Sequence, residues 1–128
     1  MDLAYQRTTD LPFDQVVTRI DEKTAAKGFK VLHVHDVAAT LAAKGLQREP
    51  YKIMEICNAG YANEALQADP LVGLMMPCKI NVYREGGKTQ VVAMRAEMIG
   101  QFFPEAHLEK MGEEVGRIAR EIVDEALA

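Results

Sequence analysis

Two cysteines are the residues of this sequence best suited to chemistry. Cys57 ends a predicted strand, and Asn58 directly after it is a residue type that favours the N-cap of a helix. The first N–H groups of a helix are unpaired and partly positive, so they stabilise a neighbouring thiol as the reactive thiolate. Cys57 is therefore a candidate nucleophile, sulfur carrier or redox thiol. The alternative is a small buried apolar residue, which is the usual role of a free cysteine.

The second cysteine, Cys78, lies within another predicted strand. Because side chains alternate across a strand, Cys78 shares an apolar, core-facing side with Ile80 and Val82. That position favours a structural role for Cys78. The two cysteines do not form a Cys-x-x-Cys motif, and the sequence leaves open whether they meet in space or form a disulfide.

Histidines and methionines near the cysteines in sequence are possible metal ligands. His33 and His35 stand two residues apart on a predicted strand, so they face the same side. Met54, Met75 and Met76 are soft donors that suit copper(I), but a strand methionine more often fills the core. No cluster of ligands at a recognised spacing accompanies them, so no metal site is predicted. The candidate ligand-binding residues are Asn58, Tyr61, His33 and Met54.

Alternating strands and helices must position these side chains. Pro12 opens a helix whose apolar residues recur at helical spacing, and Gly28 suits its C-terminal cap. Further helices are predicted over 37–44, 59–69 and from Pro104 to about 126. Strands are predicted over 3–8, 29–36, 51–57, 75–85 and 88–94.

The resulting order, β-α-β-α-β-α-β-β-α, predicts an α+β fold. We expect two layers, with a single mixed β-sheet of about five strands covered by helices. The glycines at 86–87 lie between two strand-like runs and predict a β-hairpin, which supplies at least one antiparallel pair. The last helix carries an apolar stripe that packs on the sheet or forms a subunit interface.

Composition excludes several functional classes. The chain of 128 residues suits one domain, and its 48% hydrophobic and 27% charged residues exclude a disordered chain. Two cysteines are too few for a disulfide-built scaffold. A net charge of -4 argues against nucleic-acid binding, and no apolar run approaches the ~20 residues of a membrane helix. Without a visible export signal, we expect a cytoplasmic protein.

Several stretches together resemble a known family, catalogued as domain of unknown function 302 (DUF302). The stretches are Gly28-Phe29-Lys30-Val31-Leu32, Asp36-Val37, Tyr51-Lys52-Ile53-Met54-Glu55-Ile56-Cys57-Asn58, Ala62, Leu66 and Gly73-Leu74-Met75-Met76-Pro77-Cys78-Lys79-Ile80-Asn81-Val82-Tyr83. The resemblance spans nearly the whole chain, and Cys57-Asn58 and Pro77-Cys78 are its most specific parts. The chain departs from the family where a proline commonly follows the Cys-Asn pair, since Ala59 stands there.

The resemblance implies one small α+β domain over 1–128 that forms a homodimer and has no assigned activity. It places cysteines at both Cys57 and Cys78, which strengthens the functional interpretation of Cys57. The leading hypothesis is a dimeric accessory module that binds a small molecule or an anion near Cys57.

Two alternatives to that hypothesis remain. One is a thiol-based sulfur carrier or redox protein that uses Cys57, with or without Cys78. The other is a structural or interaction module with both cysteines in the core. The sequence contains no recognised phosphate-binding loop, nucleophile elbow or zinc-protease motif. It identifies no cofactor and does not decide whether the protein is an enzyme.

Overall fold

Five strands form one antiparallel sheet in the order β1-β5-β4-β3-β2. The computed structural model describes residues 2–128. The strands are β1 (Ala4–Thr9), β2 (Lys30–Asp36), β3 (Tyr51–Cys57), β4 (Cys78–Glu85) and β5 (Lys88–Met94). The helices are α1 (Phe13–Ala26), α2 (Val37–Ala42), α3 (Ala59–Ala68), the 3-10 helix η1 (Pro70–Met75), α4 (Met98–Phe102), the 3-10 helix η2 (Pro104–Ala106) and α5 (Glu109–Leu127).

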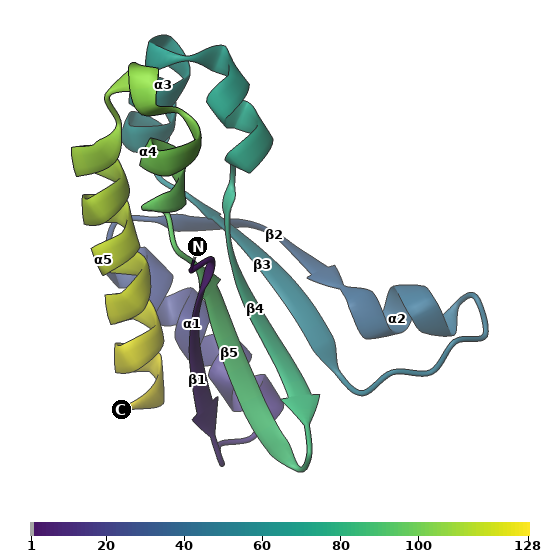
Figure 1. Cartoon of the computed structure of the whole chain (residues 1–128). Helices are drawn as coiled ribbons and strands as arrows, with labels where there is room; N and C mark the ends of the chain where they lie inside the picture. Colours follow the sequence, from purple (N-terminus) through teal and green to yellow (C-terminus); the bar gives the residue numbers. More distant parts are fainter. Residues whose placement is uncertain (1) are drawn as a thin grey trace.

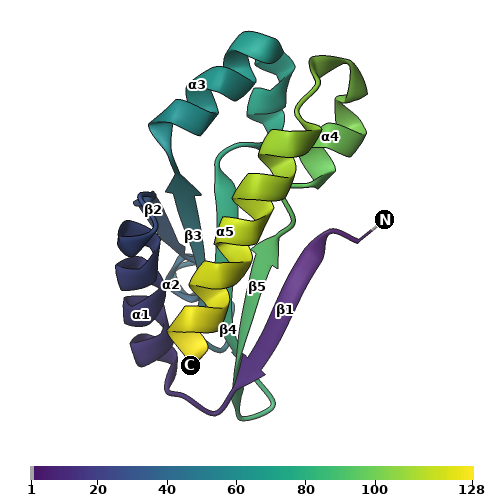
Figure 2. The same ribbon diagram turned by 90° about the vertical axis from the view of Figure 1, so that its left-hand side faces the viewer.

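The helices α1 and α5 cover one face of the sheet (Figures 1 and 2). Both are amphipathic, so each buries an apolar stripe against the strands. The core between the two layers contains Ile20 of α1, Ile80 and Val82 of β4, and Ile122 of α5, all fully buried. In the described part of the chain, no long helix lies on the opposite sheet face, and the short α2 lies beyond the end of β2 (Figure 1).

A second group of helices lies past one end of the sheet. The helices α3, η1 and α4 gather where β3 ends and β4 begins (Figure 1). Asn58 begins α3 as predicted, because its side chain accepts a hydrogen bond from the Tyr61 N–H. This end of the molecule therefore brings the strand ends that carry the two cysteines together with three helices.

The α+β class and the five strands predicted from sequence are confirmed, but the sheet is not mixed. All neighbouring strands are antiparallel. A helix between two strands predicts a parallel pair only if it crosses the sheet and returns the chain to the starting end. Here α2, and α3 with η1, occupy the ends of the sheet, so the following strand runs back antiparallel.

Two element starts and one short helix also differ from the predictions. The predicted strand 75–85 begins only at Cys78, because residues 70–75 form η1. The helix expected from Pro104 begins at Glu109, because 104–106 form a separate 3-10 turn and His107 has a left-handed φ of 57°. The helix α4 was not predicted, since five residues are too few to show helical periodicity. Across residues 2–128, no helix is long and apolar enough to span a bilayer.

Candidate functional site

A pocket opens where the end of β3 and the start of β4 meet α3 and α5. It leaves about 450 Å³ free of protein atoms, part of it open to solvent. Its walls come from the turn before β2, from both strand ends and from three helices. The lining residues are Phe29, Ile56, Cys57, Asn58, Tyr61, Ala62, Ala65, Met76, Pro77, Cys78, Ala96, Ile99, Met111, Gly112 and Val115.

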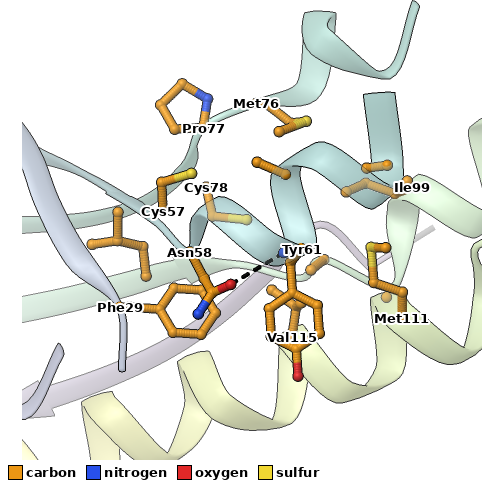
Figure 3. Close-up of a pocket in the computed structure, with 15 residues that line it drawn as sticks. Phe29, Cys57, Asn58, Tyr61, Met76, Pro77, Cys78, Ile99, Met111 and Val115 are labelled. Carbon is orange, nitrogen blue, oxygen red and sulfur yellow. Dashed lines mark hydrogen bonds between the residues drawn. The ribbon is translucent and has the colours of Figure 1, made fainter. Parts of the chain in front are cut away.

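The two cysteines share this pocket, which the sequence alone did not decide. Cys78 pairs with Ile56 in the β3–β4 ladder, and Cys57 is the next residue of β3. Both thiols are free and partly buried. Figure 3 shows their side chains on the same side of the cavity. The ladder register therefore explains why residues 57 and 78 meet at one end of the sheet.

Asn58 joins two segments at the edge of the pocket. Its Oδ1 accepts a hydrogen bond from the Tyr61 N–H at 3.1 Å, which caps α3. Its Nδ2 donates to the Gly28 carbonyl at 3.0 Å. Gly28 adopts φ +78°, a conformation that favours glycine, so the chain turns sharply from α1 toward Phe29. The two hydrogen bonds fix the start of α3 against this turn.

Tyr61 and Phe29 form an aromatic wall of the pocket. Their ring centroids lie 5.9 Å apart with an interplanar angle of 29°, within the range of favourable aromatic pairs. The Tyr61 hydroxyl points toward α5 (Figure 3). There its hydrogen bond with the Glu114 carboxylate raises the pKa of Tyr61. Tyr61 thus contributes its ring to the pocket and its polar atom to the rim.

Close packing of α5 completes the pocket. A Cβ at Gly112 would lie only 2.9 Å from the Ala96 carbonyl oxygen, so a glycine lets α5 approach the segment before α4. Met111 and Val115, on either side of Gly112, then reach the cavity. The pocket depends on contacts between segments from residue 29 to residue 115, which no short motif contains.

Burial controls the acid–base behaviour of both thiols. It raises the pKa of Cys57, a direction opposite to the thiolate stabilisation expected beside a helix N-terminus. The Tyr61 N–H of that terminus is already taken by Asn58, and the surroundings are apolar. Burial, with a smaller contribution from Cys57, raises the pKa of Cys78 to about 11, while Lys79 acts in the opposite direction. Both cysteines are protonated at neutral pH.

Of the predicted ligand-binding residues, the structure brings together Asn58 and Tyr61 but not His33 and Met54. Met54 is 1% exposed and belongs to the core between sheet and helices. His33 is exposed beside His35, with ring centroids 4.3 Å apart, and His35 Nε2 lies 3.2 Å from Glu55 Oε1. Among residues 2–128, no three His, Cys, Asp or Glu side chains gather as metal ligands.

Several pocket residues were missed by the sequence-based prediction. Phe29, Ile99, Met111 and Val115 are apolar residues whose sequence pattern indicates only burial. Two local signals existed: Phe29 lies in a stretch that resembles the family, and Met76, two residues before Cys78, was considered with the soft donors. The rest could be found only from the packing of α5 and α4 against the strand ends.

The arrangement is an apolar cavity with two thiols and a small polar rim, carried by a five-stranded antiparallel sheet. These features define a small α+β domain with a pocket at the end of its sheet. The chain belongs to the DUF302 family: the family model described as "Domain of unknown function DUF302" matches residues 5–126. The family had been predicted from the sequence, and this match confirms it.

A solved structure agrees with that assignment. The chain is similar to an uncharacterized conserved DUF302 protein from Bacillus stearothermophilus, with 26% sequence identity and a TM-score of 0.91. The likeness covers 98% of this chain and 99% of that one. A comparison with curated proteins found no match.

Proposed function

We propose that this protein is a small-ligand-binding module whose site is the pocket beside Cys57. The observation that carries the proposal is the cavity itself, since side chains from distant segments line an apolar cavity of about 40 Å³ that opens to solvent. Ligand sites are typically concave and mostly apolar, with a few polar groups that orient the ligand. Asn58, Tyr61 and the two thiols supply such groups here.

The lining favours an apolar or soft ligand over an anion. No lysine, arginine or histidine is among the residues that line the cavity in the described part of the chain. The Asn58 side chain already accepts a hydrogen bond from the Tyr61 N–H. This N–H is one of the donors that an anion at the α3 N-terminus would use. The lining therefore favours a small ligand of apolar or soft character and disfavours an anion.

Binding is also favoured over nucleophilic thiol chemistry. A sulfur carrier or redox thiol acts as thiolate, and a lowered pKa supports that role. Burial instead raises the pKa of both Cys57 and Cys78. We therefore assign the thiols to the wall of a binding site.

A ligand screen with a filled-pocket control tests the proposal. We expect a panel of small apolar compounds to contain one that raises the melting temperature with concentration and shifts the amide NMR signals of Asn58 and Val115. Ala62→Leu places a larger side chain in the cavity and should abolish both effects. Ala68→Leu makes the same change at an exposed position of α3 and should leave them intact. Effects that persist in Ala62→Leu, or are missing across the panel, would exclude this pocket as the site.

We further propose that the module is a cytoplasmic homodimer. Support comes from the sheet face opposite α1 and α5, here called the open face, which includes Tyr51, Ile53, Tyr83 and Val92. These side chains are only partly buried within one chain. Tyr51 and Tyr83 stack on this face with ring centroids 4.9 Å apart, which adds aromatic surface to it. A second copy of the chain is the partner that we assign to it.

A further inference from the structure

The lining of the pocket is rich in sulfur. The thiols of Cys57 and Cys78 and the thioethers of Met76 and Met111 all line it. These residues come from the end of β3, the segment before β4, the start of β4 and α5. Figure 3 shows Cys57, Met76 and Cys78 around the same space, with Met111 on the side of α5.

We propose that the ligand of this pocket is a soft monovalent metal ion, Cu(I), held by the sulfur atoms of Cys57, Cys78 and Met76. The inference rests on the proposed function, because it names the ligand class of the same site. Thiolate and thioether donors select Cu(I), whereas carboxylate and carbonyl donors suit Mg²⁺ and Ca²⁺. No aspartate, glutamate or histidine lines the described pocket, so a hard cation finds no carboxylate ligand there.

Metal binding here exchanges protons and leaves the oxidation state unchanged. The two thiols release two protons to solvent as their sulfur atoms bind Cu⁺, which leaves a bis-thiolate complex with a net charge of minus one. Because each proton must be displaced, the apparent affinity should fall by up to about 100-fold for each unit that the pH is lowered.

Anaerobic titration with Cu(I) against a chromophoric Cu(I) chelator tests the inference. We expect one Cu(I) per chain, with sulfur-to-copper charge-transfer absorbance in the ultraviolet. Loss of a direct ligand should exceed the 10–100-fold effect typical of outer-shell partners, so Cys57→Ser and Cys78→Ser should each weaken binding by more than about 100-fold. Met76→Leu should weaken it less. Met75→Leu, a neighbouring methionine outside the pocket, should bind like the unmodified chain.

The controls separate this inference from the proposed function. Circular dichroism of each serine variant shows whether it folds, and His33→Gln with His35→Gln tests the exposed histidines as the alternative Cu(I) ligands. Unchanged binding in folded Cys78→Ser, or loss in the histidine variants, would overturn the inference. If Cu(I) fails to bind while an apolar compound still shifts Asn58 and Val115, the metal inference falls and the pocket remains a binding site.

Discussion

At the scale of single residues, Asn58 and the cysteines show how local chemistry depends on surroundings. Asn58 uses both ends of its amide, one to cap α3 and one to bind the Gly28 carbonyl. Cys57 lies directly before that cap, yet its thiol faces an apolar cavity. The pKa of Cys57 therefore follows its burial, and the nearby helix terminus does not lower it.

Removing the Asn58 side chain should destabilise the fold. An N-cap asparagine replaced by alanine costs about 1 kcal/mol, and the lost bond to Gly28 adds a similar amount, so Asn58→Ala should lower the free energy of unfolding by about 2 kcal/mol. Asn58→Asp keeps the capping oxygen but loses the Nδ2 donor, so its loss should be about half as large. Urea unfolding followed by circular dichroism measures both. Equal stability of Asn58→Ala and the unmodified chain would contradict the assigned hydrogen bonds.

The raised thiol pKa values predict slow alkylation at neutral pH. Only the thiolate reacts, so the iodoacetamide rate of each cysteine should keep rising through pH 9, and that of Cys78 should level off only near its pKa of about 11. Mass spectrometry of each modified peptide across the pH range reads the two residues separately. A Cys57 that reaches its full rate below pH 8 would instead support the thiolate-based alternative.

The same shift predicts a pH dependence of stability. The folded-state pKa of Cys78 lies above its ordinary value of 9.0, so the folded chain holds this proton more tightly than the unfolded chain. By linkage, the stabilisation is fully present below about pH 9 and is lost as pH rises toward 11, by an amount on the order of 2 kcal/mol. Cys78→Ala should flatten this fall in urea unfolding series. If the stability of Cys78→Ala falls by the same amount as the pH rises, the pH dependence comes from other groups.

At the scale of elements, α5 forms one wall of the pocket by packing two glycines against the segment before α4. A Cβ at Gly112 would lie 2.9 Å from the backbone oxygen of Ala96, and one at Gly116 would lie 2.0 Å from Glu97 Oε1. The Glu97 side chain is further held by Arg120, with Oε2 and Nη1 2.6 Å apart. The helix thus fits its neighbours because two of its positions lack side chains.

Alanine at Gly112 should therefore destabilise the protein. In an ordinary helix, glycine to alanine stabilises by about 1 kcal/mol. Here the new methyl group meets a backbone oxygen that must shift, and overpacking of this kind costs about 1–3 kcal/mol. Gly116→Ala should cost less, since it meets the end of a movable glutamate side chain, and Glu97→Ala in the same chain should relieve it. Thermal and urea unfolding give the comparison, and a more stable Gly112→Ala would refute the close approach.

At the scale of the whole molecule, α1 and α5 cover one sheet face, and the open face is the surface that we propose for a second copy of the chain. The proposed homodimer should have twice the 14.2 kDa mass of the chain. Light scattering after size exclusion measures this mass. Val92→Lys places a charge on the open face and should shift the protein to monomer, while Glu105→Lys at an exposed position elsewhere should not. A dimer that survives Val92→Lys would place the interface on another surface.

Features that depend on residues close together in the chain could be predicted from the sequence. The β3 bounds, the Asn58 cap and the turn at Gly86 follow from alternation, capping and glycine preferences. The strand directions could not be predicted. A short helix at the end of a sheet and a longer helix across it both give the same alternation of strands and helices in the sequence. A site near Cys57 was predicted, but most of its lining was not, since Phe29 and Val115 meet only through the tertiary packing of α5.

The edge position of β1 has a consequence for how the chain folds. Within residues 2–128, β1 pairs only with β5, from Ala4 opposite Met94 to Thr9 opposite Thr89, and its Arg7 reaches Asp124 of α5. Contacts between such distant residues slow folding, because a long loop must close before they form. β1 can therefore pair only after the distant residues of β5 have been synthesised. Until β1 pairs with it, β5 has an unpaired edge that can bind other chains. Aggregation during folding should therefore increase with protein concentration.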